Sequence, residues 1–288
     1  MVLILAVIFA VGGATALTYS PAASWFSDYN QSLAVDDYVD AIDGLGPAAE
    51  RQLRAAQAYN DALSSGATLE PGTAVATGDG TSAQPSLDYA KLLRTPNGIM
   101  ARIQIPVIGV DLPIYHGTDE RTLLRGAGHL RGTSLPIGGV DSHAVITAHR
   151  GLAESTMFTD LDRVSVGDRF ILTTFGRVLA YEVTARRVVE PTDTAALRQE
   201  AGRDLVTLVT CTPLGVNTHR ILVTGERIIP TPAGALDKAK EPPGALGFPW
   251  WAVLYLAALV VIALSAWWGG RVRGPRGVAT RARRSRAS

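Results

Sequence analysis

The sequence predicts a mostly β domain with short helices, preceded by a helical region and flanked by two membrane-spanning helices. Three observations support this fold class. Segments in which apolar and polar residues alternate are concentrated between residues 89 and 232. Two long apolar runs lie at the chain ends, and a stretch with helical spacing separates the first run from the alternating segments. A period of two is typical of strands and a spacing of three and four is typical of helices.

The two chain ends are apolar. Residues 246–268 carry no charge over 23 positions and are edged by tryptophan pairs. This length can cross the roughly 30 Å hydrocarbon core of a bilayer, with aromatic residues at both interfaces. Residues 1–19 form a second, shorter run. It lacks a basic start, and Ala14-Thr15-Ala16 matches a signal-peptidase site, so a retained anchor and a cleaved signal both stay open.

The charge distribution predicts the orientation. Residues 271–288 carry seven arginines and no acid, and such flanks stay in the cytoplasm. We therefore expect a multi-pass cell-membrane protein with a cytoplasmic tail at residues 269–288 and an extracellular region before residue 246. The rest of the chain carries a net charge of about −6, which argues against nucleic acid as a partner.

The region from residue 20 to residue 66 is predicted to be helical. Pro47 suits the first turn of a second helix after a break at Gly44, and the chain should form a helical hairpin. Within that helix an apolar stripe is formed by Leu53, Ala56, Tyr59 and Leu63. Residues 67–88 are rich in Gly, Thr, Ser and Ala without a period, which predicts a mobile loop.

The region from residue 89 to residue 232 is predicted to be a β-barrel or sandwich of about 135 residues. Half-buried or buried strands are expected at residues 101–108, 143–149, 168–175, 177–189, 204–211 and 219–229. Short helical pieces are expected at residues 156–164 and 193–202, and residues 233–245 are expected to be a linker before the second membrane segment.

The only cysteine, Cys211, ends one predicted strand, and His219 and Arg220 begin the next. If these strands form a hairpin, Cys211 and Arg220 lie side by side at one end of a sheet. A nearby positive charge lowers the pKa of a thiol, and the thiolate is the nucleophile. A guanidinium can also donate to the oxyanion of a tetrahedral intermediate. One cysteine permits neither an intramolecular disulfide nor a multi-cysteine metal site.

Acyl transfer to a thiol also needs a proton donor for the departing amine, and histidine suits neutral pH. The candidates are His116, His129, His143, His149 and His219. Composition does not choose among them. His149 lies at a predicted strand end, where a side chain reaches the sheet rim as Cys211 does. Asp160 and Asp162 are candidates for a third member of a protease-like triad.

Several separated motifs resemble the sortase family, in the family's order. TLVTCTPLGVNTHRILVTGER resembles the catalytic strand pair, and HAVITAHRGLAESTMFTDLDRVSVGD resembles the catalytic-histidine segment. NGIMARIQIPVIGVDLPIYHGT resembles the first strands of the barrel, and HLRGTSLPIGG the segment before the histidine strand. The resemblance implies a closed sortase-like barrel over residues 89–232. It also implies Cys211 as nucleophile, His149 as general acid and Arg220 as third catalytic residue, without a cofactor or metal.

Within that family the chain resembles class C, the pilus-polymerising enzymes. The segments NTHR and HRGL, the helical region ending AYNDALSSG and the second membrane anchor carry this resemblance. It implies cleavage of an LPXTG-like signal between Thr and Gly, a thioester on Cys211 and transfer to a lysine of the next pilin. Partners would be LPXTG-bearing pilins or surface proteins. An aromatic lid plug, frequent in class C, has no counterpart around Glu70-Pro71-Gly72, so we expect an open site.

Other functions fit parts of the same sequence. A sortase that anchors surface proteins would use a cell-wall peptide amine as acceptor. A secreted cysteine protease would use water, and a non-enzymatic membrane scaffold would use neither. The chain could itself be a sortase substrate, because an apolar helix followed by arginines resembles a sorting tail. However, AKEPPGALGFPWW holds no LPXTG-like pentapeptide, which favours a membrane anchor.

Overall fold

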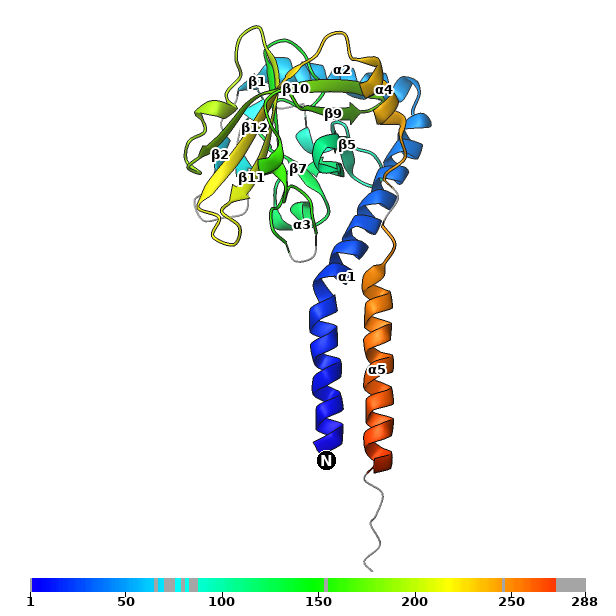
Figure 1. Cartoon of the computed structure of the whole chain (residues 1–288). Helices are drawn as coiled ribbons and strands as arrows, with labels where there is room; N and C mark the ends of the chain where they lie inside the picture. The colour runs from blue at the N-terminus through cyan, green and yellow to red at the C-terminus, as the bar shows by residue number, and fades with distance from the viewer. Residues whose placement is uncertain are drawn as a thin grey trace, which may run out of the picture. The chain divides into compact units, whose positions relative to one another are not determined.

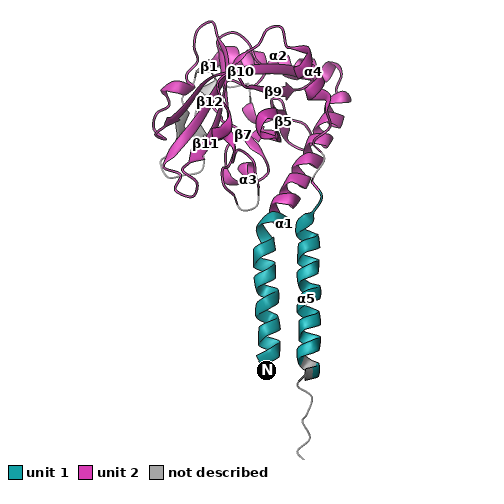
Figure 2. Cartoon of the chain, viewed as in Figure 1, with its two compact units in different colours: residues 1–22, 248–288 teal, residues 23–247 magenta. Residues whose placement is uncertain are grey.

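The computed structural model describes residues 2–64, 67–69, 76–78, 81–82, 88–152, 155–244 and 247–272. The chain divides into two compact units, one formed by residues 1–22 and 248–288 and the other by residues 23–247 (Figure 2). Every strand lies in the second unit.

The first unit contains two apolar helical segments that run side by side (Figure 1). They belong to α1 (Val2–Asp43) and α5 (Trp250–Val272), both long and apolar enough to cross a membrane. The Thr15 hydroxyl lies 3.0 Å from the Tyr255 hydroxyl, within hydrogen-bonding distance. These helices indicate membrane anchoring. α1 is continuous across residue 19, where the first apolar run was expected to give way to the helical region, and Pro21 lies inside the helix.

The second unit is built around a closed β-barrel of eight strands (Figure 1). In barrel order these are β10 (Arg177–Val189), β12 (His219–Arg227), β11 (Asp204–Thr212), β8 (Ser142–Thr147), β7 (Ala127–His129), β6 (Val110–His116), β5 (Ile99–Ile105) and β9 (Arg169–Thr174). The pairs β6–β7 and β8–β11 are parallel and the others antiparallel. The predicted mostly β fold with a closed barrel is confirmed.

Alternation predicted β9, β10, β11 and β12 to within two residues at their ends. The short helical pieces proved smaller than expected, because only single 3₁₀ turns form, at Leu161–Arg163 and Ala195–Leu197. Three elements of the barrel region were not among the strands and helices expected individually: β6, which only the family resemblance covered, β7 and α3 (Glu120–Leu123). β7 spans three residues, and α3 is one turn capped by the Asp119 side chain, so neither is long enough to show a period. Two further 3₁₀ turns span Tyr89–Lys91 and Pro106–Ile108.

In the strand expected at residues 101–108, Ile103 and Ile105 alternate with Arg102 and Gln104, which predicts a half-buried strand. This was wrong, because all seven residues of β5 are buried and residues 106–108 form a 3₁₀ turn. The residues expected to be linker fold back as α4 (Ala233–Lys240). The Arg102 guanidinium donates to the carbonyls of Ala239 and Glu241 and pairs with Asp111, while the Gln104 amide donates to the Lys238 carbonyl. Polar side chains that alternation assigned to solvent therefore bind the C-terminal end of α4, where carbonyls lack helical partners.

The predicted helical hairpin is present in the second unit. α1 ends at Asp43 and α2 spans Pro47–Ala62, with the expected stripe buried except for Leu63, which lies beyond the helix end. Asn60 accepts from the Leu135 amide and donates to the Leu135 carbonyl. The Tyr38 hydroxyl of α1 donates to the Met100 carbonyl at 3.2 Å. It also accepts a hydrogen bond from the Phe175 amide at 3.0 Å. Both helices are thereby fixed to the barrel.

The segment predicted as a mobile loop contains short paired strands. β1 (Leu63–Ser64) pairs with β4 (Thr81–Ser82), and β2 (Ala67–Leu69) pairs with β3 (Ala76–Gly78), both antiparallel. Ladder hydrogen bonds use main-chain groups, so pairing does not need the apolar alternation that the sequence lacks. The tripeptide Glu70-Pro71-Gly72 lies outside the described residues.

Candidate active site

The predicted hairpin of β11 and β12 brings Cys211 and Arg220 together. The two residues are direct partners in the antiparallel register, one pair from the end of the ladder. Both side chains are buried, with exposed fractions of 3% for Cys211 and 1% for Arg220. The thiol and the guanidinium therefore share one end of the barrel, as the sequence predicted.

His149 reaches the same end through the parallel pair β8–β11. The last pair in that ladder is Thr147 with Val209, followed by a hydrogen bond of 3.3 Å from the Ala148 amide to the Val209 carbonyl. The Thr210 hydroxyl then donates to the Ala148 carbonyl at 2.8 Å. The same register continued by two residues brings His149 opposite Cys211. Three residues distant in sequence thus meet on neighbouring strands.

The ring of His149 keeps one nitrogen available. His149 is 4% exposed, and its Nε2 has no hydrogen-bond partner among the described residues. The Glu120 carboxylate of α3 approaches this nitrogen to 3.6 Å. Burial lowers the pKa of His149, and the negative charge of Glu120 opposes that shift. The imidazole is accordingly neutral at pH 7, with a nitrogen able to accept a proton.

Cys211 differs from the sequence-based expectation in its ionisation. Burial raises the pKa of the Cys211 thiol, and the nearby Arg220 charge lowers it by a smaller amount. The arginine acts in the predicted direction, but desolvation of the thiolate outweighs it. The resting site therefore holds a protonated thiol and not a preformed thiolate.

Arg220 and Arg150 are held by the loops of the site. Nη1 of Arg220 donates to the carbonyls of Asn217 and His219 at 2.9 and 3.0 Å. Nη1 of Arg150, the residue after His149, donates to the Thr212 hydroxyl at 2.8 Å. Nη2 of Arg150 lies 2.8 Å from the Asp162 carboxylate. Arg150, which follows His149 in the chain, is therefore hydrogen-bonded to Thr212, which follows Cys211.

The other four histidines lie in different surroundings. His116 contacts the Leu92 carbonyl, His129 the Ser134 carbonyl and Tyr89 hydroxyl, and His143 the Arg198 carbonyl and Thr207 hydroxyl. His219 is exposed and contacts Thr218. Of the two candidate aspartates, Asp160 pairs with Arg163, and Asp162 pairs with Arg150, the residue that follows His149. Among the five histidines, His149 is the one that the register of β8 and β11 brings opposite Cys211.

A cavity of about 520 Å³ lies near this end of the barrel, and Cys211, His149 and Arg220 are not among its lining residues. It is lined by Arg150, Asp162, Arg186, Val188, Thr212, Pro213, Leu214 and Ile221. Thr212 and Ile221 are the chain neighbours of Cys211 and Arg220, and successive side chains of a strand face opposite sides of the sheet, so these two lining residues face away from the thiol and the guanidinium. The cavity is apolar along Val188, Leu214 and Ile221 and charged at Arg150, Asp162 and Arg186.

Sequence reasoning did not identify Glu120 or Arg150 as parts of the site. The signal for Glu120 was local, because Asp119 caps the turn that begins at Glu120. A capping residue predicts where a helix starts, but it does not predict that Glu120 lies beside His149 in the folded protein. For Arg150, adjacency to His149 was the only signal.

The catalytic domain matches a known family. A family model described as the sortase domain matches residues 103–228. Sortase A from Bacillus anthracis is 27% identical over 146 residues, which cover 50% of this chain and 68% of that protein.

Solved structures resemble a larger part of the chain. Sortase C-1 from Actinomyces oris shares 47% identity with a TM-score of 0.56, covering 62% of this chain and 98% of that one. The pilus-related sortase C of Group B Streptococcus shares 39% identity with a TM-score of 0.59, covering 67% and 96%. At these identities the likeness extends beyond the fold to the family.

Proposed function

Because this chain belongs to the sortase family of cysteine transpeptidases, and to its class C, we propose that it cleaves an LPXTG-like sorting signal between Thr and Gly. Cys211 is the nucleophile, His149 transfers protons and Arg220 binds the oxyanion. One observation carries this assignment above the others. Cys211 and Arg220 form a register pair, and His149, whose buried Nε2 has no hydrogen-bond partner among the described residues, lies just past the end of the adjoining strand.

The ionisation of the site supports a definite order of proton transfers. Burial raises the pKa of Cys211 and lowers the pKa of His149, so the proton begins on sulfur. As sulfur attacks the threonine carbonyl carbon, the thiol proton moves to Nε2 of His149. The carbonyl oxygen becomes an oxyanion, and the Arg220 guanidinium donates to it. His149 then protonates the departing glycine nitrogen as the C–N bond breaks, which leaves a thioester on Cys211.

The second half of the reaction reverses these transfers. An acceptor amine attacks the thioester carbonyl, its proton passes to His149, and the thiol is re-formed when the carbon–sulfur bond breaks. The acceptor proposed here is a lysine amine of a pilin. This choice is supported by the relatives of class C, one of which is described as pilus-related. Entering and leaving amines occupy the same position relative to His149 in such a cycle.

The two apolar helices support a location at the cell membrane. The arginine-rich tail at residues 269–288 favours the cytoplasmic side, which leaves the catalytic domain on the outer face. Pilins or surface proteins that carry a sorting signal would meet the enzyme there.

The test uses a sorting peptide and the full chain in detergent micelles. Wild type should form an acyl adduct that mass spectrometry places on Cys211, and Cys211→Ala should form none while keeping its circular dichroism spectrum. A persistent adduct on Cys211→Ala would rule out this nucleophile.

Acceptor identity is tested in the same reaction with two labelled amines. Transfer to a pilin lysine peptide supports polymerisation, and transfer to a cell-wall peptide amine alone supports surface anchoring. Hydrolysis without transfer would indicate a protease.

A further inference from the structure

The chain segment after His149 is held at both ends. The His149 carbonyl accepts from the Phe158 amide at 3.1 Å, and an isolated β-bridge joins Leu152 to Ser155. At the start of the segment, the Arg150 side chain donates to the Thr159 carbonyl at 3.0 Å. The position of His149 thus depends on how residues 150–158 are fixed, a range in which residues 153 and 154 lie outside the description.

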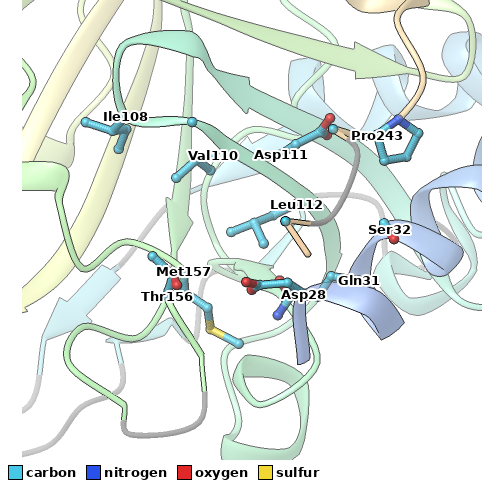
Figure 3. Close-up of a pocket in the computed structure, with 13 residues that line it drawn as sticks. Asp28, Gln31, Ser32, Ile108, Val110, Asp111, Leu112, Thr156, Met157 and Pro243 are labelled. Atoms are coloured by element: carbon cyan, nitrogen blue, oxygen red, sulfur yellow. The ribbon is translucent and has the colours of Figure 1, made fainter. Parts of the chain in front are cut away.

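Contact between this segment and α1 is incomplete. A cavity of about 290 Å³ has Thr156 and Met157 on one wall, Asp28 and Gln31 of α1 on another, and Leu112 of β6 between them (Figure 3). Over the cavity the segment gains no packing energy from α1, because atoms across a void have no contact partners.

Gln31 connects α1 to the segment beside this cavity. Its Nε2 lies 3.2 Å from the Ser155 hydroxyl oxygen, to which it donates, and each side chain is 5% exposed. The same nitrogen lies 3.2 Å from the hydroxyl of Ser27, on the same helix. A buried hydrogen bond whose partner is removed leaves a desolvated polar group, which is costly. The contact therefore opposes any movement of Ser155 away from α1.

We propose that Gln31 is a positioning residue for the reaction: through Ser155 it holds the segment that sets the place of His149 relative to Cys211. Gln31 touches neither substrate nor thiol. α1 is then more than an anchor, since the helix that carries the first apolar run also carries a residue on which proton transfer depends. This inference rests on the proposed function, because it assumes that His149 transfers the proton.

The test compares full-length variants in detergent micelles with a fluorogenic sorting peptide. Gln31→Leu and Ser155→Ala should each lower kcat by about fivefold, the effect of one net hydrogen bond, with KM changed by less than about twofold. The double variant should be no slower than the slower single variant, because both remove one contact. Ser155→Thr keeps a hydroxyl at this position and should retain most of the wild-type kcat.

Ser32→Ala is the matched control, since the Ser32 hydroxyl donates to the Tyr29 carbonyl within α1. Its kcat should equal that of wild type. Rates are normalised to the Cys211 that reacts with an alkylating probe, well below the melting temperature. An unchanged kcat in both Gln31→Leu and Ser155→Ala overturns the inference, even if their melting temperatures fall. Failure of wild type to form an acyl adduct would instead overturn the proposed function.

Discussion

Arg220 combines a charge with donors in a fixed orientation. Its Nη1 is fixed by the Asn217 and His219 carbonyls, and a lysine ammonium cannot reproduce the planar fork. We predict that Arg220→Lys loses about a hundred- to a thousandfold in kcat, the usual effect of removing an oxyanion donor. Steady-state kinetics with a sorting peptide measures this loss. Recovery of most activity by lysine would mean that Arg220 serves mainly as a positive charge.

The ionisation of Cys211 predicts a pH dependence of its alkylation. The pKa of the thiol is raised by burial, so the thiolate fraction keeps growing as pH rises through the ordinary range of cysteine. We therefore expect the rate with iodoacetamide to increase continuously from pH 6 to above about pH 9. Arg220→Met removes the charge that lowers the pKa and should move the curve to higher pH.

The alternative is a thiolate–imidazolium pair in the resting enzyme. That pair would give an alkylation rate that is already on a plateau near neutral pH. A flat profile between pH 6 and pH 8 would contradict the neutral resting site.

Residue types alone predicted one part of this site well. Cys211 and Arg220 follow from a single cysteine and an arginine flanking one short loop, since hairpin geometry is local. The partner of Cys211 among five histidines does not follow in this way, because β8 and β11 are parallel and joined by a long connection. The resemblance to sortases selected His149. The direction in which the pKa of Cys211 shifts could not be predicted from the sequence. It depends on how deeply the thiol is buried, and a strand pattern does not give that depth.

At the scale of elements, α4 depends on a buried ion pair. Arg102 is 1% exposed and pairs with Asp111, and the same guanidinium binds the end of α4. We predict that Asp111→Ala lowers the free energy of unfolding by about 3 kcal/mol, because it leaves a buried charge without its counter-ion. Urea unfolding of the detergent-solubilised chain measures the change.

A double variant separates charge from packing at α4. Arg102→Met with Asp111→Leu removes both charges and should be more stable than Asp111→Ala alone, since apolar replacements of a buried pair are often tolerated. If the double variant were the less stable one, the carbonyl contacts to α4 would outweigh the ion pair.

Element prediction succeeded where the environment of a strand is simple. β9 to β12 are runs rich in β-branched and other apolar residues, and the expected ranges matched their ends to within two residues. The prediction was wrong for β5 because Arg102 and Gln104 are buried under α4, and a period cannot distinguish a side chain facing solvent from one bound to a helix end. α4 itself lacks a side-chain N-cap, so its start carried no signal.

At the scale of the whole molecule, orientation across the membrane is a testable proposal. Cys211 is the only cysteine, so Cys211→Ala provides a cysteine-free background. Ile229 in the second unit is 80% exposed, and Ile229→Cys should react with a membrane-impermeant maleimide on intact cells. Arg286→Cys in the basic tail should react only after permeabilisation. The reverse pattern would invert the proposed topology.

The parallel pairing of β8 with β11 also affects when the enzyme becomes active. His149 and Cys211 follow strands that are separated by β9 and β10 in the chain, so they meet only after the intervening segment has closed a long loop. Contacts between distant parts of a chain form late, because loop closure must be offset by other contacts first. A nascent or translocating chain therefore carries Cys211 before His149 has been brought to it. The proposed catalytic pair is therefore complete only when the barrel has closed.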